Sequence, residues 1–125
     1  GDFLIDRSNP RKAKKCLTKV EKRLKKGWNM LIFPEGTRSL DGELLPFKRG
    51  AFKLAFDSDA TVIPCYINGS NNIVQKRSLN ASPGTVRIFF DKPIETKSLP
   101  NTKDNMITVL NQTFEKINHL KQLNS

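Results

Sequence analysis

The chain has 125 residues, of which 37% are hydrophobic, and this suits one domain with a core of its own rather than a disordered tract. Its formal charge of +10 favours an anionic partner, such as nucleic acid, an anionic membrane surface or a phosphorylated substrate. Cys16 and Cys65 lie in no CxxC or Cys/His cluster, so we expect no metal site. No apolar run approaches the roughly 18 residues of a transmembrane helix.

The N-terminal quarter predicts a short strand followed by a basic helix. Residues 3–5 are apolar and strand-like, and the chain starts so close to them that we expect it to be the C-terminal part of a longer protein. Pro10 suits the first position of a helix that runs to Lys26, with Gly27 as its stop. The apolar stripe of this helix recurs at spacings of four, three and four, and consists of Ala13, Leu17, Val20 and Leu24.

The middle of the chain predicts a second strand and a second helix. "WNMLIF" at 28–33 is a near-continuous apolar run, which is typical of a strand buried on both faces. Pro34 ends it because proline has no N–H to donate to a sheet. A loop is expected over 34–47 and a short helix over 48–57.

The last half predicts two further strands and a long helix. The strands are expected at 61–67, where Pro64 favours an edge or a bulge, and at 85–90, with a polar loop over 68–83 between them. The final helix is expected from about Thr102, with its apolar stripe on Ile107, Leu110, Phe114, Ile117 and Leu120. Strands and helices alternate, so the sequence predicts an α/β fold with a largely parallel central sheet flanked by helices.

Charged residues follow the first two predicted strands. Arg7 follows the first, and Glu35, Gly36 and Arg38 follow the second. In open α/β sheets ligands bind beyond the carboxyl ends of the strands, so Arg7 and Arg38 are expected to face one site. Two guanidinium groups match phosphate, and Gly36 permits close approach of backbone to a ligand. Glu35 either accepts a hydrogen bond from a ligand hydroxyl or holds an arginine in place.

Four stretches in order resemble the glycerolipid acyltransferase family, which includes bacterial 1-acylglycerol-3-phosphate acyltransferase. "FPEGTRS" at 33–39 is similar to the family's signature loop. The other three are similar to the blocks before and after it, and they are "GDFLIDR" at 1–7, "PFKRGAFKLA" at 46–55 and "VIPCYI" at 62–67. The resemblance covers residues 1–67 and implies that 1–125 is part of a glycerol-3-phosphate acyltransferase-like domain.

The resemblance implies transfer of a fatty acyl group to the free hydroxyl of lysophosphatidic acid, which makes phosphatidic acid. The donor would be acyl-coenzyme A or acyl carrier protein, with no other cofactor. The implied glycerol-phosphate site consists of Arg7, Glu35, Gly36, Thr37 and Arg38. The implied acyl and substrate pocket consists of Val62, Ile63 and Pro64. Glycerol-3-phosphate or another lysolipid stays open as the acceptor.

The family's general base is a histidine in an H-x-x-x-x-D motif, which the resemblance places upstream of Gly1. The one histidine of the chain, His119, lies on the last predicted helix and is not followed by an acid at that spacing. We therefore expect no catalytic residue within this chain. Residues 1–125 alone are expected to bind acceptor at best.

The basic helix over 10–26 suggests where the protein works. Its lysines and arginines are accompanied by one acid, Glu21, and they suit attraction to anionic lipid headgroups. This predicts the cytoplasmic face of a membrane, with peripheral attachment or an anchor in the missing N-terminal part. A basic nucleic-acid-binding module is the alternative of another class. No nucleic-acid partner is expected, since no RNP-type, zinc-finger or KH motif is present.

Overall fold

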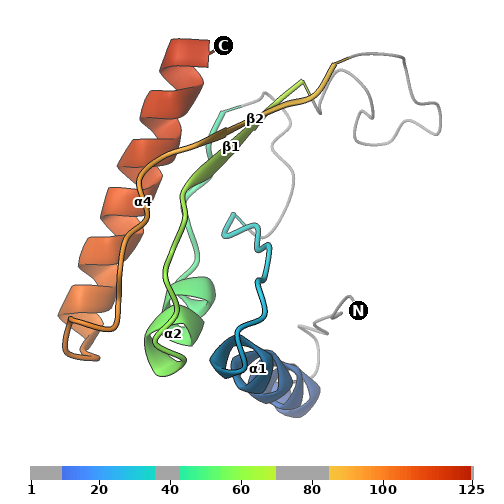
Figure 1. Cartoon of the computed structure of the whole chain (residues 1–125), viewed down its shortest axis with the longest axis vertical. Helices are drawn as coiled ribbons and strands as arrows, with labels where there is room; N and C mark the ends of the chain where they lie inside the picture. Colours follow the sequence, from blue (N-terminus) through green and yellow to red (C-terminus); the bar gives the residue numbers. More distant parts are fainter. Residues whose placement is uncertain (1–9, 36–42, 70–84, 125) are drawn as a thin grey trace.

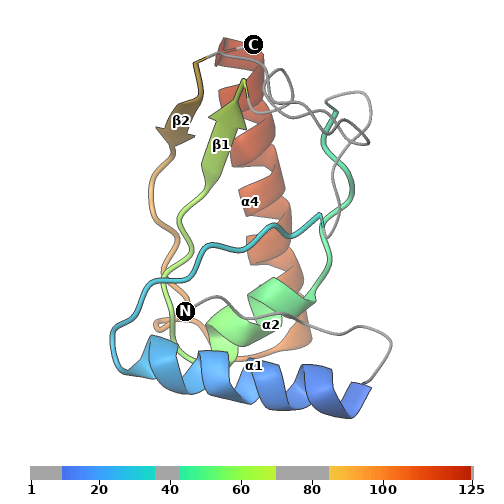
Figure 2. The same cartoon turned by 90° about the vertical axis from the view of Figure 1, so that its right-hand side faces the viewer.

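A computed structural model describes residues 10–35, 43–69 and 85–124. Its elements are helices α1 (Pro10–Lys25), α2 (Gly50–Asp57) and α4 (Lys103–Asn124), with strands β1 (Cys65–Asn68) and β2 (Arg87–Phe90). Figure 1 shows α4 standing beside the β1–β2 pair, with α2 at the foot of α4. Figure 2 shows α1 lying across the same end of the molecule, below α2. The predicted strand at 3–5 lies outside the described residues.

The three predicted helices are confirmed, with small shifts at their ends. Helix α1 ends as its sequence predicts, because Gly27 adopts a φ of +93°, a left-handed conformation that favours glycine. The Gly27 N–H donates to the carbonyl of Leu24 at 3.0 Å, and the Trp28 N–H donates to that of Arg23 at 3.1 Å. These bonds satisfy carbonyls that the end of a helix would otherwise leave unpaired.

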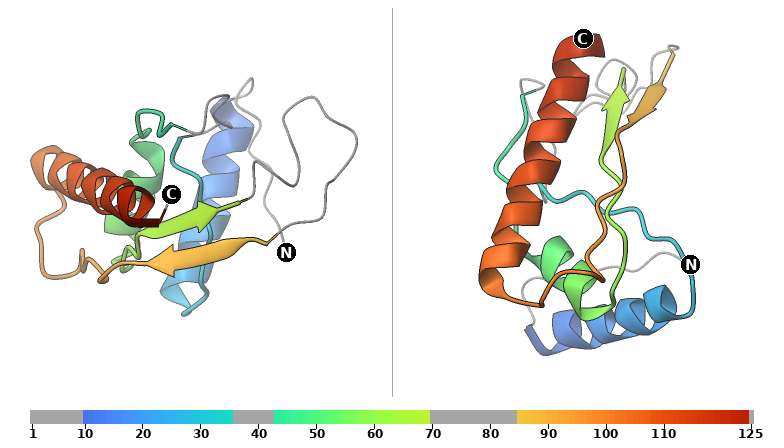
Figure 3. Two further views of the ribbon diagram at one scale, coloured as in Figure 1. Left: turned by 90° about the horizontal axis from the view of Figure 1, so that it is seen from above. Right: turned by 60° about the vertical axis from the view of Figure 1, so that its left-hand side comes forward.

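The sheet in the described residues has two strands, and they are antiparallel. Cys65 lies opposite Phe90, and Asn68 lies opposite Arg87. The parallel sheet that we predicted is therefore not confirmed. The reason is in the connection, since a parallel pair needs a crossover, usually a helix, whereas the sequence between these strands is polar and has no helical periodicity. Figure 3 shows α4 along one face of the pair.

The prediction of a buried strand at 28–33 is wrong for the described structure. The segment has no strand assignment, and its large side chains are exposed, with Trp28 at 57%, Leu31 at 67% and Phe33 at 63%. A strand exists only when its backbone pairs with a neighbour. Apolar composition marks a segment that can pair but does not provide the partner.

The core lies where α2 meets α4. Phe52, Phe56 and Val109 form its centre. Phe47 precedes α2 and packs its ring against both helices, at 6.3 Å from the ring of Phe52 and 5.0 Å, edge-on, from that of Phe114. This cluster ties the loop that follows Glu35 to the C-terminal helix.

The apolar stripes of the helices are partly as predicted. In α1 Val20 is buried, and Leu17 and Leu24 are half-buried. In α4 the buried residues are Val109, Thr113 and Ile117, so Ile117 of the predicted stripe is confirmed, whereas Ile107, Leu110, Phe114 and Leu120 are half-buried. Thr113 is tolerated there because its hydroxyl donates to the carbonyl of Val109 at 2.7 Å, so its burial leaves no polar atom unpaired.

Candidate functional site

Glu35 closes the base of a loop. It follows the extended segment 28–33, and its carboxylate Oε2 accepts the backbone N–H of Leu45 at 2.9 Å. A second bond lies beside it, since the Lys48 N–H donates to the carbonyl of Pro34 at 2.8 Å. The bond to the Glu35 carboxylate is charge-assisted, and such bonds are about twice as strong as neutral ones. These two bonds hold residues 34–35 beside residues 45–48, so the loop 34–48 is closed at its base.

The structure shows one partner of the Glu35 carboxylate. We expected its carboxylate to meet a ligand hydroxyl or an arginine, and in the described residues it meets a backbone N–H. Leu45 was missed in the sequence because every residue except proline carries such an N–H, so no residue type signals it. The only hint was the length of the loop and its return into the apolar residues before Phe47.

The phosphate-binding part of the predicted site remains a prediction. Four of its residues lie outside the described ones, namely Arg7, Gly36, Thr37 and Arg38. The prediction that the two guanidinium groups face one site is therefore not tested. Of the predicted glycerol-phosphate residues, Glu35 alone is described, and it is half-buried at the entrance of the loop.

Segment 62–64 divides between core and surface. Val62 forms an isolated antiparallel bridge with Ile94 and packs against the core, while Pro64 is fully buried. Ile63 is 55% exposed between them. The Pro64 carbonyl accepts the N–H of Asp91 at 3.0 Å, but the proline has no N–H to donate in return, so the ladder ends just before β1 begins. Of the three predicted pocket residues, only Ile63 presents a free apolar side chain.

His119 lies exposed on α4, as expected for a surface helix residue. It lines a shallow depression together with Asp91, Gln112, Glu115 and Lys116. Asp91 is 3.6 Å from the Lys116 ammonium. The adjacent N–H of Lys92 is the main reason why the pKa of Asp91 lies below its usual value, followed by the Lys116 charge. We assign no reaction chemistry to this depression.

Both cysteines are free thiols and half-buried. Burial raises the pKa of the Cys65 thiol, which makes it a poor nucleophile at neutral pH. Among the residues that the structure describes, no group of His, Cys, Asp and Glu side chains is arranged to hold a metal ion.

Comparison with known proteins defines the class of this chain. Residues 1–68 match the acyltransferase family, and the chain belongs to that family. This range contains the closed loop, α1, α2 and segment 62–64.

Two relatives show which enzymes of the family the chain is similar to. The chain is 36% identical over 102 residues to the 1-acyl-sn-glycerol-3-phosphate acyltransferase of Cocos nucifera, with 81% of this chain and 33% of the relative covered. It is 40% identical over 95 residues to a chloroplastic enzyme of the same name from Arabidopsis thaliana, with 75% of this chain and 27% of the relative covered.

A solved structure supports the fold. The crystal structure of the 1-acyl-sn-glycerophosphate acyltransferase PlsC from Thermotoga maritima superimposes with a TM-score of 0.72 at 27% identity. The match covers 87% of this chain and 45% of that one. The chain thus spans about a third of the length of the curated relatives and under half of the solved one. No helix in the described part of the chain is long and apolar enough to cross a bilayer.

Proposed function

We propose that the protein containing this chain transfers a fatty acyl group from a thioester donor to 1-acylglycerol-3-phosphate and so makes phosphatidic acid. The donor is acyl-coenzyme A or acyl carrier protein. Residues 1–125 form part of the acyltransferase domain and contribute its acceptor site. Supporting this are the family membership and the names of the relatives.

Acyl transfer requires a base for the acceptor hydroxyl and a site that holds the acceptor phosphate. The acceptor hydroxyl oxygen attacks the thioester carbonyl, so a C–O bond forms, the C–S bond breaks, and the hydroxyl proton goes to a base and then to the departing thiolate. The acceptor phosphate must be held so that the hydroxyl is in line. We assign the second task to this chain, through Arg7 and Arg38, and the base to no residue in it.

One structural observation carries the proposal, and it is the bond from Leu45 to Glu35. It keeps the loop that contains Gly36, Thr37 and Arg38 closed at its base, at the end of an apolar segment. A closed loop places its donors at lower entropic cost than an open one. This supports the proposal that the loop receives a phosphate, because the Glu35 carboxylate is occupied by a backbone N–H and is not left free to repel the anion.

The proposal is tested with the complete protein. Lysophosphatidic acid is expected to trigger release of free thiol from acyl-coenzyme A, and Arg7→Ala or Arg38→Ala is expected to raise the acceptor KM by about 10-fold or more, since each removes a charge-assisted bond. The matched control is Arg49→Ala, at the start of α2. Unchanged acceptor kinetics in both variants would refute the phosphate-site assignment. Turnover with glycerol-3-phosphate but not with lysophosphatidic acid would show that glycerol-3-phosphate is the acceptor.

We also propose that the central sheet of the complete domain is larger than the β1–β2 pair and largely parallel, and that other parts of the protein cover segment 28–33. In the described residues Leu31 and Phe33 of this segment are exposed, and so is the sheet face that carries Ile88 and Phe90, at 54% and 67%. Apolar surfaces of this size are normally covered by another part of the protein or by a partner. Hydrogen exchange of the complete protein is expected to be slow at the amides of 29–33, and fast exchange there would refute this cover.

We place the protein at the cytoplasmic face of a membrane, in contact with anionic lipid, because its substrate and product are lipids and its charge is +10. Fractionation of cells that express the tagged complete protein tests this. Recovery with the membrane fraction is expected, and recovery in the soluble fraction at low ionic strength would contradict it.

A further inference from the structure

Helix α1 separates its charged residues from its apolar ones. A helix turns by about 100° per residue, so Arg11, Lys15, Lys19 and Lys22 fall within about 80° of one another. Leu17, Val20 and Leu24 lie on the opposite side. All four basic side chains are exposed, whereas Val20 is 4% exposed. We call Arg11, Lys15, Lys19 and Lys22 the basic stripe, and it is about 16 Å long at 1.5 Å per residue.

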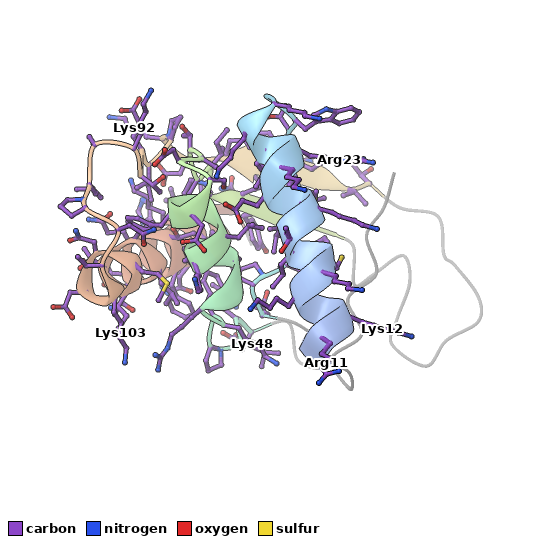
Figure 4. The ribbon with its side chains drawn as sticks, turned by 90° about the horizontal axis from the view of Figure 1, so that it is seen from below. Arg11, Lys12, Arg23, Lys48, Lys92 and Lys103 are labelled. Carbon is purple, nitrogen blue, oxygen red and sulfur yellow. The ribbon has the colours of Figure 1, made fainter. Side chains whose placement is uncertain are left out.

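The apolar side of α1 is already occupied, because the helix packs on α2. Figure 4 looks onto the outer side of α1 from below, with Arg11 and Lys12 near its start and Arg23 near its end. The one acid of the helix, Glu21, is half-buried and forms an ion pair with Lys25 at 3.0 Å, so it lies beside the basic stripe and not within it. The stripe is therefore a row of positive charge on the outermost surface at this end of the molecule.

This arrangement decides the kind of contact that α1 can make. A helix that inserts into a bilayer surface needs an apolar face free to enter it. Here that face is used inside the protein, and among the α1 side chains that the structure describes, the exposed ones are Lys, Arg and Thr. The contribution of α1 itself to docking must therefore rest on charge, so it is reversible and falls steeply with salt.

We propose that the basic stripe docks the protein on anionic lipid headgroups, without insertion of α1. This rests on the proposed function, in which the acceptor is itself a membrane lipid. A protein partner is the less suitable occupant. Protein interfaces centre on buried aromatic or apolar anchors, and none stands among the exposed side chains described for α1. A plane of phosphate groups needs only an exposed row of cations.

The test measures partition of the complete protein onto vesicles that contain no acceptor lipid. The quantity is the ratio of partition onto phosphatidylcholine vesicles with 30% phosphatidylglycerol to partition onto phosphatidylcholine alone. This ratio removes the effect of any anchor elsewhere in the protein. Glutamine keeps helix propensity, so the variant is R11Q/K15Q/K19Q/K22Q, with its helix content checked by circular dichroism.

The matched control removes the same charge elsewhere. R87Q/K92Q/K97Q/K103Q changes four exposed cations outside α1. At about 5-fold per basic residue near an anionic surface, the stripe variant is expected to lose about 100-fold or more of the ratio at low salt, and the control less than about 5-fold. Equal losses in both variants would overturn the proposal, because net charge and not the stripe would then decide binding.

Two further measurements separate lipid docking by the basic stripe from the proposed acyltransferase function and from binding of a donor protein. Acyl transfer to acceptor in neutral detergent micelles is expected to be unchanged in the stripe variant. Absence of that activity in the unaltered protein would refute the proposed function, while the vesicle ratio would still decide the docking surface. A stripe variant with an unchanged vesicle ratio and a raised KM for acyl carrier protein alone would assign the stripe to an acidic donor protein and overturn docking on lipid.

Discussion

The carboxylate of Glu35 accepts the backbone N–H of Leu45, ten positions further along the chain, at 2.9 Å. This bond gives the Glu35 carboxylate a partner within the chain, next to the residues that we propose bind phosphate. The loop is closed by an interaction between a signature residue and the backbone, so the identity of Glu35 matters although that of Leu45 does not.

Glu35→Ala is expected to raise the acceptor KM by about 10-fold or more, because a bond to a charged acceptor contributes about 1.5–3 kcal/mol and its loss frees the loop. Glu35→Gln retains an oxygen acceptor and is expected to recover part of the loss. Steady-state kinetics with varied acceptor measure both. The control is Glu43→Gln, an exposed residue of the same loop, paired with Lys121 at 2.8 Å. Equal effects at positions 35 and 43 would exclude loop closure as the role of Glu35.

Ile63 and Val62 are expected to differ in what their truncation changes. Ile63→Ala removes an exposed side chain, so we expect a shift in acyl-chain preference with little change in Tm. Val62→Ala removes packing from the core and is expected to lower the free energy of unfolding by about 1.5 kcal/mol. Thermal melts and turnover with donors of two chain lengths separate the effects. A large fall in Tm for Ile63→Ala would mean that this residue packs inside the complete domain.

Phe52→Ala is expected to destabilise the protein by about 3–5 kcal/mol, because it empties the centre of the core between α2 and α4. Phe52 is 3% exposed and stacks with Phe47, so the loop after Glu35 loosens with it. Denaturant unfolding measures the loss. Leu123→Ala, at 67% exposure near the end of α4, is the control and is expected to change stability by less than about 0.5 kcal/mol.

Gly69→Ala is expected to disturb the end of β1. Gly69 has a φ of +95°, and a Cβ there would collide with the backbone oxygen of Thr85. The left-handed conformation alone costs about 1–2 kcal/mol for a residue with a Cβ, and the collision adds to it. Gly27→Ala is the matched control, since its φ of +93° is similar but no atom lies near its Cβ. A larger loss of stability at position 27 than at 69 would contradict the collision.

Asp57 is expected to contribute to acid sensitivity. A hydrogen bond from Asn101 and then one from Lys53 lower the pKa of its carboxyl below the usual value. Its folded pKa is below its unfolded one, so its stabilisation is present above about pH 4 and is lost as pH falls through the folded pKa. Asp57→Asn is expected to flatten the stability curve below pH 4 and to cost about 0.5 kcal/mol at neutral pH, because the pair with Lys53 is partly exposed. Urea unfolding across pH measures this, with Glu95→Gln as the exposed control.

Local patterns in the sequence predicted what depends on near neighbours. The α1 stripe, its end at Gly27 and the position of the motif loop follow from residues within a few positions of one another, and the helices formed as expected. The prediction of which α4 residues are buried was only half right. Val109, Leu110 and Thr113 lie close together on the helix, so the elements that pack against α4 decide which of these side chains are buried.

The sequence by itself determined the family, the three helices and the division of α1 into an apolar and a basic side. Only the tertiary structure decided that β1 and β2 are antiparallel, that Glu35 bonds to Leu45, and that Ile63 faces outward while Pro64 is buried. The reason is the range of the interactions. Helix formation depends on contacts three or four residues apart, whereas strand pairing and loop closure join backbone groups far apart in the chain, and backbone groups are the same in every residue except proline.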